Sequence, residues 1–285
     1  MPKVSLVVCV YDEFIFLERL LGGIEGYYDD LVAIHDGPEK VGVQDPTSIE
    51  RLVRRHGGGF FIGPRSFQQE PHWPFAWAQA KQDWILRLDA DEVPSVELKK
   101  WLRDFRNAPE PDVMVSGYTC VWPLWNGKRS VTRRWPADRI FLFHKERVRF
   151  FGMVEQVPVA DGYFEALSLI LQHRPRRRSY GFENLILRKQ AYQWRHVIAK
   201  SLLDKPTDLP CWRWTNEEWP LVWEQIRRQP IRTALRRLLG WPFRTVRDMR
   251  RIEGRVIFSA ALSSGVHHCL IAINYWRMRD SISKP

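Results

Sequence analysis

The sequence has few cysteines and lacks the common nucleotide and metal fingerprints. Its four cysteines (Cys9, Cys120, Cys211 and Cys269) are widely spaced and form no CxxC pair. A disulfide framework or a zinc site is therefore not indicated, and a reducing cytoplasm is the simpler setting. No GxGxxG follows the first apolar run and no GxxxxGK[ST] occurs, so neither a dinucleotide fingerprint nor a P-loop is present.

Long, purely apolar runs are also scarce. The opening residues, MPKVSLVVCVYDE, contain a short apolar run that leads into acidic residues, which predicts a strand and not a signal peptide. Residues 256–276 have the length of a membrane-spanning helix, but they include serines, an asparagine and the pair His267-His268. These polar groups favour a buried or interfacial helix over a spanning one.

Positive charge is abundant but unevenly spread along the chain. The net charge is +11, yet residues 1–173 hold 21 Lys and Arg against 24 Asp and Glu. Residues 174–285 hold 23 against 9, so all of the basic excess lies in the last part of the sequence. Such a region attracts phosphate groups, either of nucleic acid or of an anionic membrane.

The segment PIRTALRRLLG (230–240) predicts a basic amphipathic helix. One face would carry apolar residues and the other would carry arginines: Ile231, Ala234, Leu235, Leu238 and Leu239 against Arg232, Arg236 and Arg237. This pattern is typical of helices on a membrane surface, although a helix packed on a protein core shows the same stripe. Trp241, Phe243 and further arginines follow, which suits the headgroup boundary.

Nucleic acid is the rival partner for these arginines. The sequence contains no zinc finger, RNP-like motif or helix-turn-helix pattern. We therefore expect residues 201–285 to form a basic, Trp- and Arg-rich helical region that associates with an anionic membrane. The chain would then be peripheral on the cytoplasmic, inner face of the cell membrane and would not bind nucleic acid.

The first half of the chain alternates predicted strands and helices. Strands are predicted at 4–10, 30–37, 59–64 and 84–92, and helices at 14–24, 45–58 and 75–82. This alternation predicts an α/β fold with a mostly parallel sheet flanked by helices. Longer strands of a mixed sheet are predicted at 112–122, 139–145 and 166–173.

Acidic residues follow the predicted strands. They are Asp12 and Glu13 after the first strand, with Tyr11 beside them, Asp36 after the second, and Asp89 and Asp91 after the fourth. In a parallel sheet these positions share one edge, where ligands bind. Carboxylates crowded in this way raise one another's pKa unless a positive group lies between them. Two aspartates one residue apart suit Mg²⁺ or Mn²⁺ with substrate phosphates, although solvated turns and helix caps show the same spacing.

Three segments in this order carry a resemblance to a known family. VSLVVCVYDE, LVAIHDG and DWILRLDADEVPS resemble the nucleotide-binding half of family 2 glycosyltransferases of the GT-A fold. The closest likeness in character is to bacterial lipopolysaccharide-core and cell-envelope glycosyltransferases. The resemblance implies a GT-A, Rossmann-like domain over 1–200, with a nucleotide-binding half (1–110) and an acceptor half (111–200).

The resemblance also implies a reaction and roles for residues. The reaction would be inverting and metal-dependent, moving a sugar from a nucleotide donor, a UDP-sugar in the first instance, to a lipid-linked or cell-envelope glycan. The nucleotide sugar would contact Tyr11, Asp12, Glu13, Asp36 and Asp89, with Tyr11 against the uracil and Asp36 on the base or ribose. The Mn²⁺ or Mg²⁺ ion would be bound by Asp91, with Asp89 and His173 as further ligands.

An inverting transfer needs a base for the acceptor hydroxyl. In FFGMVEQVPV (150–159) the resemblance implies Glu155 for this role, with Asp138 as the reserve, although Val154 stands where the family has His. The Arg-rich loop 128–139 would clamp an anionic acceptor or the diphosphate.

The chain departs from the family's pattern at the first two motifs. Asp12-Glu13 replaces Asn-Glu, and Asp36-Gly37-Pro38 replaces Asp-Gly-Ser. Two other classes therefore stay open. One is another nucleotide-dependent transferase, such as a nucleotidyltransferase, and the other is a catalytically inactive, membrane-bound scaffold of the same fold.

Overall fold

The protein is described by a computed structural model of the 285-residue chain. The structure describes residues 1–38, 46–123, 139–150, 152, 156–175, 195–204, 213–214, 219–249 and 257–282. The chain divides into two compact units, which we describe separately. The first comprises Met1–Gly152 and Val159–Arg176, and the second comprises Met153–Pro158 and Arg177–Pro285.

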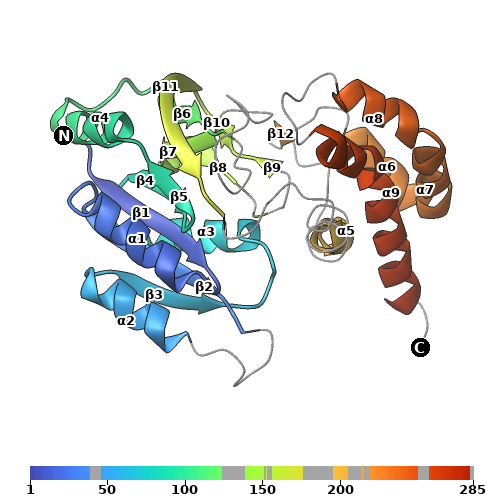
Figure 1. Ribbon diagram of the computed structural model, residues 1–285, viewed down its shortest axis with the longest axis horizontal. Coiled ribbons are helices and arrows are strands. Elements are labelled where there is room, and N and C mark those ends of the chain that lie inside the picture. The colour runs from blue at the N-terminus through green and yellow to red at the C-terminus, as the bar shows by residue number, and fades with distance from the viewer. Residues whose placement is uncertain are drawn as a thin grey trace. The chain divides into compact units, whose positions relative to one another are not determined.

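The first unit is an α/β domain (Figure 1). Its strands in the main sheet are β1 (Val4–Val10), β2 (Asp30–Asp36), β3 (Gly59–Gly63), β4 (Trp84–Asp89), β5 (Glu92–Pro94), β6 (Val115–Val121), β7 (Arg139–His144) and β11 (Tyr163–His173). Its helices are α1 (Phe14–Ile24), α2 (Thr47–Arg55), α3 (Trp73–Gln79) and α4 (Val96–Asn107), with short 3-10 helices η1 (Glu70–His72) and η2 (Lys145–Arg147). A small ladder pairs β8 (Val148–Arg149) with β10 (Val159–Ala160).

The order of the eight main strands is β3-β2-β1-β4-β7-β6-β11-β5. Strands β3, β2, β1 and β4 are parallel, and β6 pairs in parallel with β11, whereas β7 is antiparallel to both β4 and β6. The sheet is therefore mostly parallel, as the sequence predicts. The carboxyl ends of β1, β2 and β4 meet at one edge, because Cys9 lies opposite both Ile34 and Asp89. We call this edge the acidic rim.

The parallel strands are buried on both faces. Along β1, Val4, Leu6, Val8 and Val10 belong to the core that includes residues of α1, α2 and α4. Val7 is buried on the opposite face, the side on which α3 contacts β1 and β2. Burial on both sides explains why the strand sequence is almost continuously apolar.

Residues 84–92, predicted as one strand with a polar end, form two strands separated by a turn. β4 ends at Asp89, and β5 begins at Glu92 and belongs to the far edge of the sheet, beside β11. Helix α4 follows at once, and its N-cap Ser95 accepts a hydrogen bond from the backbone N–H of Leu98 at 3.1 Å. The acidic turn is therefore anchored on both sides by regular structure.

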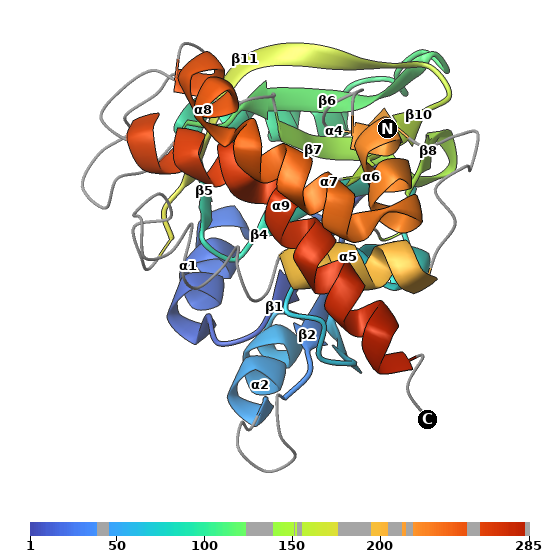
Figure 2. The same cartoon turned by 90° about the vertical axis from the view of Figure 1, so that its right-hand side faces the viewer.

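The described part of the second unit is mainly helical. It contains α5 (Arg195–Asp204), α6 (Trp219–Arg228), α7 (Pro230–Leu239), α8 (Trp241–Met249), α9 (Ile257–Ile282) and a ladder of β9 (Gln156–Val157) with β12 (Arg213–Trp214). Helix α9 lies against α5, α7 and α8 (Figure 2). Its residues Cys269, Ile271, Ala272 and Tyr275 enter a core with α5, α6 and α7.

The predicted helix at 256–276 corresponds to α9, which begins at Ile257 and continues to Ile282, and some of its described residues are buried in this core. None of the helices in the described ranges combines the length and apolar character needed to cross a membrane.

Candidate functional site

The loop after β1 is held by its own glutamate. The Glu13 carboxylate oxygen Oε2 accepts hydrogen bonds from the backbone N–H groups of Tyr11, at 2.7 Å, and Asp12, at 2.9 Å. Burial raises the pKa of Glu13, while these two hydrogen bonds lower it. Glu13 therefore fixes the loop after β1, which is the first corner of the acidic rim, that is, the part of the rim formed by the end of one strand. Asp12 is exposed beside it.

Asp36, at the end of β2, is the centre of a polar cluster. Its Oδ1 accepts from the Ser66 backbone N–H at 2.6 Å and lies 2.9 Å from His72 Nε2, and its Oδ2 forms an ion pair with Arg65. Burial would raise the pKa of Asp36, but the hydrogen bonds from His72 and Ser66 and the charge of Arg65 hold it below the ordinary value. The carboxylate is thus ionised and fixed in place.

Arg65 joins the first two corners of the rim. Its guanidinium carbon lies 3.5 Å from the centroid of the Tyr11 ring while the same group pairs with Asp36. The sequence prediction included Tyr11 and Asp36 but missed Arg65 and His72. These two come from the segment that follows β3, which ends at the same edge of the sheet because Gly63 lies opposite Asp36.

Asp89 and Glu92 share one internal cation. Arg139, the first residue of β7, places Nη2 at 2.7 Å from Asp89 Oδ1 and Nε at 3.2 Å from Glu92 Oε1. This follows from strand pairing, because β7 runs antiparallel to β4 and its first residue therefore comes beside the last residue of β4. The positive group between the crowded carboxylates is thus Arg139.

The two carboxyl groups respond differently to this environment. Burial would raise the pKa of Asp89, but the charges of Arg139 and Arg87 hold it below the ordinary value. Burial raises the pKa of Glu92 to about 7, although Arg139 opposes the rise. Glu92 is completely buried, and its Oε2 accepts from the Asp89 backbone N–H at 2.8 Å. Glu92 therefore contributes to the rim from inside the protein.

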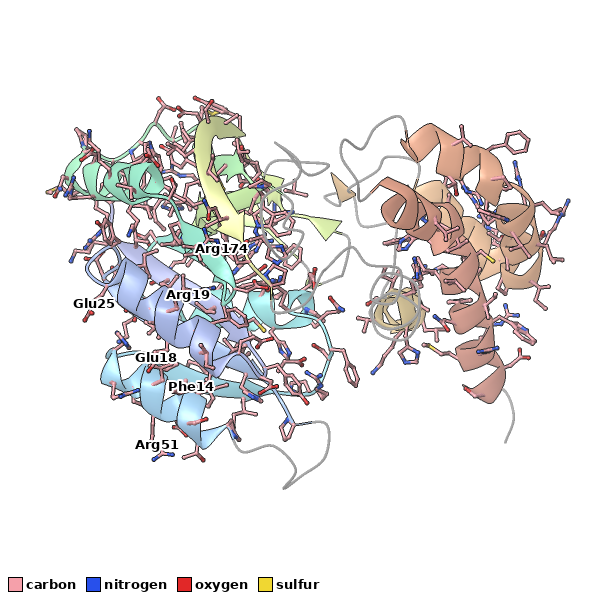
Figure 3. The ribbon with its side chains drawn as sticks, in the orientation of Figure 1. Phe14, Glu18, Arg19, Glu25, Arg51 and Arg174 are labelled. Atoms are coloured by element: carbon pink, nitrogen blue, oxygen red, sulfur yellow. The ribbon has the colours of Figure 1, made fainter. Side chains whose placement is uncertain are left out.

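The side chain of Asp91 contacts His173 and not Arg139. His173 Nε2 lies 3.2 Å from Asp91 Oδ2, and both side chains are only partly exposed. The antiparallel ladder of β5 and β11 brings them together, since His173 lies opposite Glu92. Arg174, labelled in Figure 3, donates its backbone N–H to the carbonyl oxygen of Asp91 at 2.8 Å.

Trp122 links the buried Glu92 to the partly exposed pair Asp91 and His173. Its indole Nε1–H donates to Glu92 Oε1 at 2.8 Å, and its ring stacks on His173 with centroids 4.5 Å apart. One side chain therefore holds a buried carboxyl and orients the imidazole beside Asp91.

Replacing Trp122 by phenylalanine is expected to lower the free energy of unfolding by about 1 kcal/mol, since the buried Glu92 Oε1 loses the indole hydrogen bond but keeps the charge of Arg139 nearby. Urea unfolding followed by circular dichroism measures the change. The aromatic stack on His173 is kept in this variant, so a loss below about 0.5 kcal/mol would show that the indole hydrogen bond contributes nothing.

The residues at this corner fit a divalent cation. Ligands next to each other around an octahedral ion are about 3 Å apart, close to the 3.2 Å between the Asp91 oxygen and the His173 nitrogen. Within the described ranges, no group of three or more His, Cys, Asp or Glu side chains converges on one metal position. Such an ion would therefore take its remaining ligands from water and substrate phosphates, as Mg²⁺ does in phosphate-binding sites.

Two predicted residues lie outside the described residues. They are Glu155 and Asp138, the candidates for the catalytic base. Of the predicted Arg-rich loop 128–139, only Arg139 is described, and it pairs with the protein's own carboxylates.

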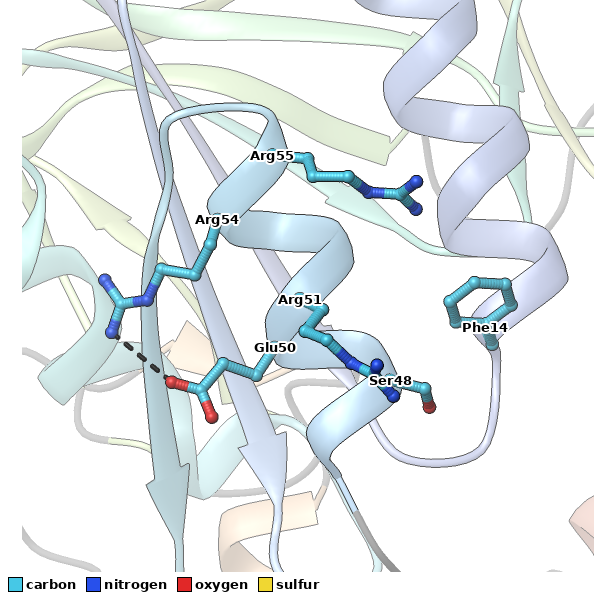
Figure 4. Close-up of a pocket in the computed structure, with 6 residues that line it drawn as sticks. All are labelled: Phe14, Ser48, Glu50, Arg51, Arg54 and Arg55. Carbon is cyan, nitrogen blue, oxygen red and sulfur yellow. Dashed lines mark ion pairs between the residues drawn. The ribbon is translucent and has the colours of Figure 1, made fainter.

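A hollow of about 690 Å³ lies elsewhere in the first unit (Figure 4). It lies between the beginning of α1 and the length of α2, and it is lined by Phe14, Ser48, Glu50, Arg51, Arg54 and Arg55. Arg54 pairs with Glu50 at 3.6 Å. The hollow contains neither Asp91 nor His173.

No protein-family model matches the chain, and no curated protein matches its sequence. Solved structures that match include Staphylococcus aureus TarS, at 14% identity and a TM-score of 0.45, over 98% of this chain and 55% of TarS. The chain therefore spans about half the length of TarS.

Two further matches were solved with ligands. The mannosyltransferase PcManGT from Pyrobaculum calidifontis, in complex with GDP-Man and Mn²⁺, is 15% identical with a TM-score of 0.45, over 100% of this chain and 76% of that protein. Glucosyl-3-phosphoglycerate synthase from Mycobacterium tuberculosis, in complex with Mn²⁺, UDP-glucose and glycerol 3-phosphate, is 15% identical with a TM-score of 0.44, over 71% of this chain and 79% of that protein.

Proposed function

We propose that this chain is a metal-dependent glycosyltransferase that takes a nucleotide sugar, in the first instance a UDP-sugar, as its donor. The observation that carries the proposal is the pair Asp91–His173, an oxygen and a nitrogen 3.2 Å apart at the carboxyl-terminal edge of a mostly parallel sheet. In such sheets this edge is where phosphorylated ligands bind. The resemblance of the three strand-end segments to family 2 glycosyltransferases supports the same function.

We assign the other rim residues to the binding of the nucleotide sugar. Tyr11 and Asp36, joined by Arg65, would bind the base and ribose, with Arg65 also supplying positive charge. Asp89, held by Arg139, would face the ribose or a metal-bound water. The Mn²⁺ or Mg²⁺ ion, when bound by Asp91 and His173, supplies Lewis-acid stabilisation of the departing diphosphate.

The stereochemical course that we propose is inversion. The acceptor hydroxyl would attack on the face opposite the diphosphate and lose its proton to a carboxylate. Glu155 is the proposed base and Asp138 the reserve. As an inverting enzyme the chain would form no covalent sugar intermediate, so a change of the anomeric configuration in the product would test this part.

The acceptor that we propose is a lipid-linked or cell-envelope glycan. Residues 1–200 would carry out the transfer, and the basic region 201–285 would keep the chain peripheral on the inner face of the cell membrane. The excess of Lys and Arg in residues 174–285 supports this division.

The test is the release of free nucleoside diphosphate by the full chain. UDP-sugars and GDP-mannose are incubated with the protein, with Mn²⁺ or with a chelator, and UDP, GDP and pyrophosphate are quantified. We expect release of the nucleoside diphosphate that needs the metal, and the same release from Asp104→Asn, a change of an exposed acid on α4. Pyrophosphate as the product would indicate a nucleotidyltransferase. Neither binding nor release with any donor would indicate an inactive scaffold.

A further inference from the structure

The amphipathic helix predicted at 230–240 does not use its apolar stripe for the protein core. Helix α7 buries Pro230, Thr233 and Ala234, and it lies against α9. Of the apolar face predicted from the sequence, only Ala234 enters the core. A helix that merely packs on a globular core would bury its leucines. Packing on the core therefore does not explain the apolar stripe of α7.

The larger apolar side chains of α7 and α8 are exposed instead. We call this set the α7–α8 ridge, and its members are between 47% and 81% exposed: Ile231, Leu235, Leu238, Leu239, Phe243 and Val246. In α7 the spacing of Ile231, Leu235 and Leu238 places them on one side of the helix. Six large apolar side chains within two consecutive helices are more than the isolated exposed residues of an ordinary surface, and such a patch marks an interaction site.

Arginines accompany the ridge. Residues 219–249 hold seven Arg against one Glu and one Asp. Arg232 and Arg236 are exposed on α7 next to the apolar positions. Arg232 donates to the neutral side chain of Gln229 at 3.2 Å, so this bond leaves its positive charge uncompensated.

The combination of exposed apolar side chains and arginines indicates the chemistry of the partner that binds the ridge. An anionic bilayer offers apolar chains below a layer of phosphate groups, which matches apolar side chains flanked by guanidinium groups. A second copy of the same face would bring arginines against arginines, which like-charge repulsion disfavours. Since no described helix can cross a membrane, the ridge would lie in the interface and not span it.

We propose that the α7–α8 ridge is the surface through which this chain inserts into anionic membranes. The inference adds a residue-level docking site to the membrane association in the proposed function. It does not depend on sugar transfer, because none of the ridge residues belongs to the acidic rim.

Flotation of the full chain with lipid vesicles tests the proposal. The chain is mixed with phosphatidylcholine vesicles that either contain or lack phosphatidylglycerol. We expect flotation only with phosphatidylglycerol, and a loss of binding of about tenfold for each large side chain removed, hence no flotation for the triple variant Leu235→Ser, Leu239→Ser, Phe243→Ser. The variant Arg232→Gln, Arg236→Gln should float less with phosphatidylglycerol, so that the difference between the two kinds of vesicle becomes smaller.

A matched control is Leu221→Ser on α6, which removes a leucine that is as exposed but lies outside the ridge. This variant should float like the wild type. The proposal is overturned if the triple variant floats as well as the wild type, or if the wild type binds duplex DNA but no vesicle. It is also overturned if the wild type is a dimer in solution that the triple variant dissociates.

Measuring the release of nucleoside diphosphate beside flotation distinguishes a failure of the ridge proposal from a failure of the proposed function. The triple variant should release nucleoside diphosphate from a soluble nucleotide sugar at the wild-type rate. Lost flotation with retained release supports both proposals. Flotation that does not depend on the ridge, with release retained, overturns the ridge alone. Absence of release in the wild type, with ridge-dependent flotation, overturns the transfer alone.

Discussion

Arg139→Met is expected to lower the free energy of unfolding by about 3–5 kcal/mol, the usual cost of removing one partner from a buried ion pair. The guanidinium of Arg139 compensates both Asp89 and Glu92, and Glu92 is completely buried. Methionine preserves much of the length and apolar contact of the arginine, so the loss reports the charge. Urea unfolding at neutral pH, with a chelator present so that no metal replaces the arginine, measures the change.

The effect should grow with pH. A carboxyl group whose pKa is raised on folding stabilises the folded state fully when the pH is below the pKa of that group in the unfolded chain. This stabilisation is lost as the pH rises through the pKa of the group in the folded protein. For Glu92 in the wild type this window runs from the ordinary value of 4.5 to about 7. Without Arg139, which lowers the pKa of both Asp89 and Glu92, the loss continues to higher pH. The difference between variant and wild type should therefore be larger at pH 8 than at pH 5.

Arg149→Met is the matched control. Arg149 pairs with Asp161 at the surface, where both side chains are more than half exposed. Exposed pairs contribute about 0–1 kcal/mol, so this variant should unfold close to the wild type at both pH values. Equal losses for the two variants would contradict a special role of Arg139, as would a loss that shrinks with rising pH.

The carboxylates of the rim could be predicted because their signal is local. The strands that lead to Tyr11, Asp36 and Asp89 are short and mainly apolar and end in a polar residue, which is the pattern of a strand buried on both faces. The order of these runs predicts a parallel sheet, and the parallel sheet predicts that their ends meet. Each step uses only neighbouring residues and a general rule of connection.

The cations of the rim could not be predicted in this way. Arg139 reaches Asp89 because β7 pairs antiparallel with β4, and Arg65 reaches Asp36 because β3 ends beside β2, with Gly63 opposite Asp36. Prediction from the acidic residues at the strand ends alone misses Arg65, whereas the contact of Arg139 depends on a strand pairing distant in sequence. His173 could be predicted in part. An apolar run that ends in histidine indicated the residue, but its contact with Asp91 depends on the register of β5 and β11.

Asp91→Asn is expected to reduce metal-dependent transfer by about a thousandfold. The Lewis-acid contribution of a bound metal is worth several kcal/mol in the transition state, and each 1.4 kcal/mol corresponds to about a factor of ten. Asn keeps the size of the side chain but offers a neutral ligand. Initial rates of UDP release with Mn²⁺, and the binding of UDP with and without Mn²⁺ by calorimetry, measure the two effects.

The fold should survive this substitution. The carboxylate of Asp91 is partly exposed and contacts His173, whereas the turn is anchored by the backbone carbonyl of Asp91, which accepts from the Arg174 N–H. We therefore expect a change in the free energy of unfolding within about 1 kcal/mol. A loss of activity together with unfolding would assign Asp91 a structural role instead.

A double-mutant cycle with His173→Gln separates a shared metal from two independent contributions. If Asp91 and His173 hold the same ion, either change alone removes most of the metal effect, and the double variant should be little worse than Asp91→Asn. If they act separately, their losses multiply. UDP binding that remains dependent on Mn²⁺ in Asp91→Asn, with rates near those of the wild type, would place the metal elsewhere and remove the basis of the proposed function.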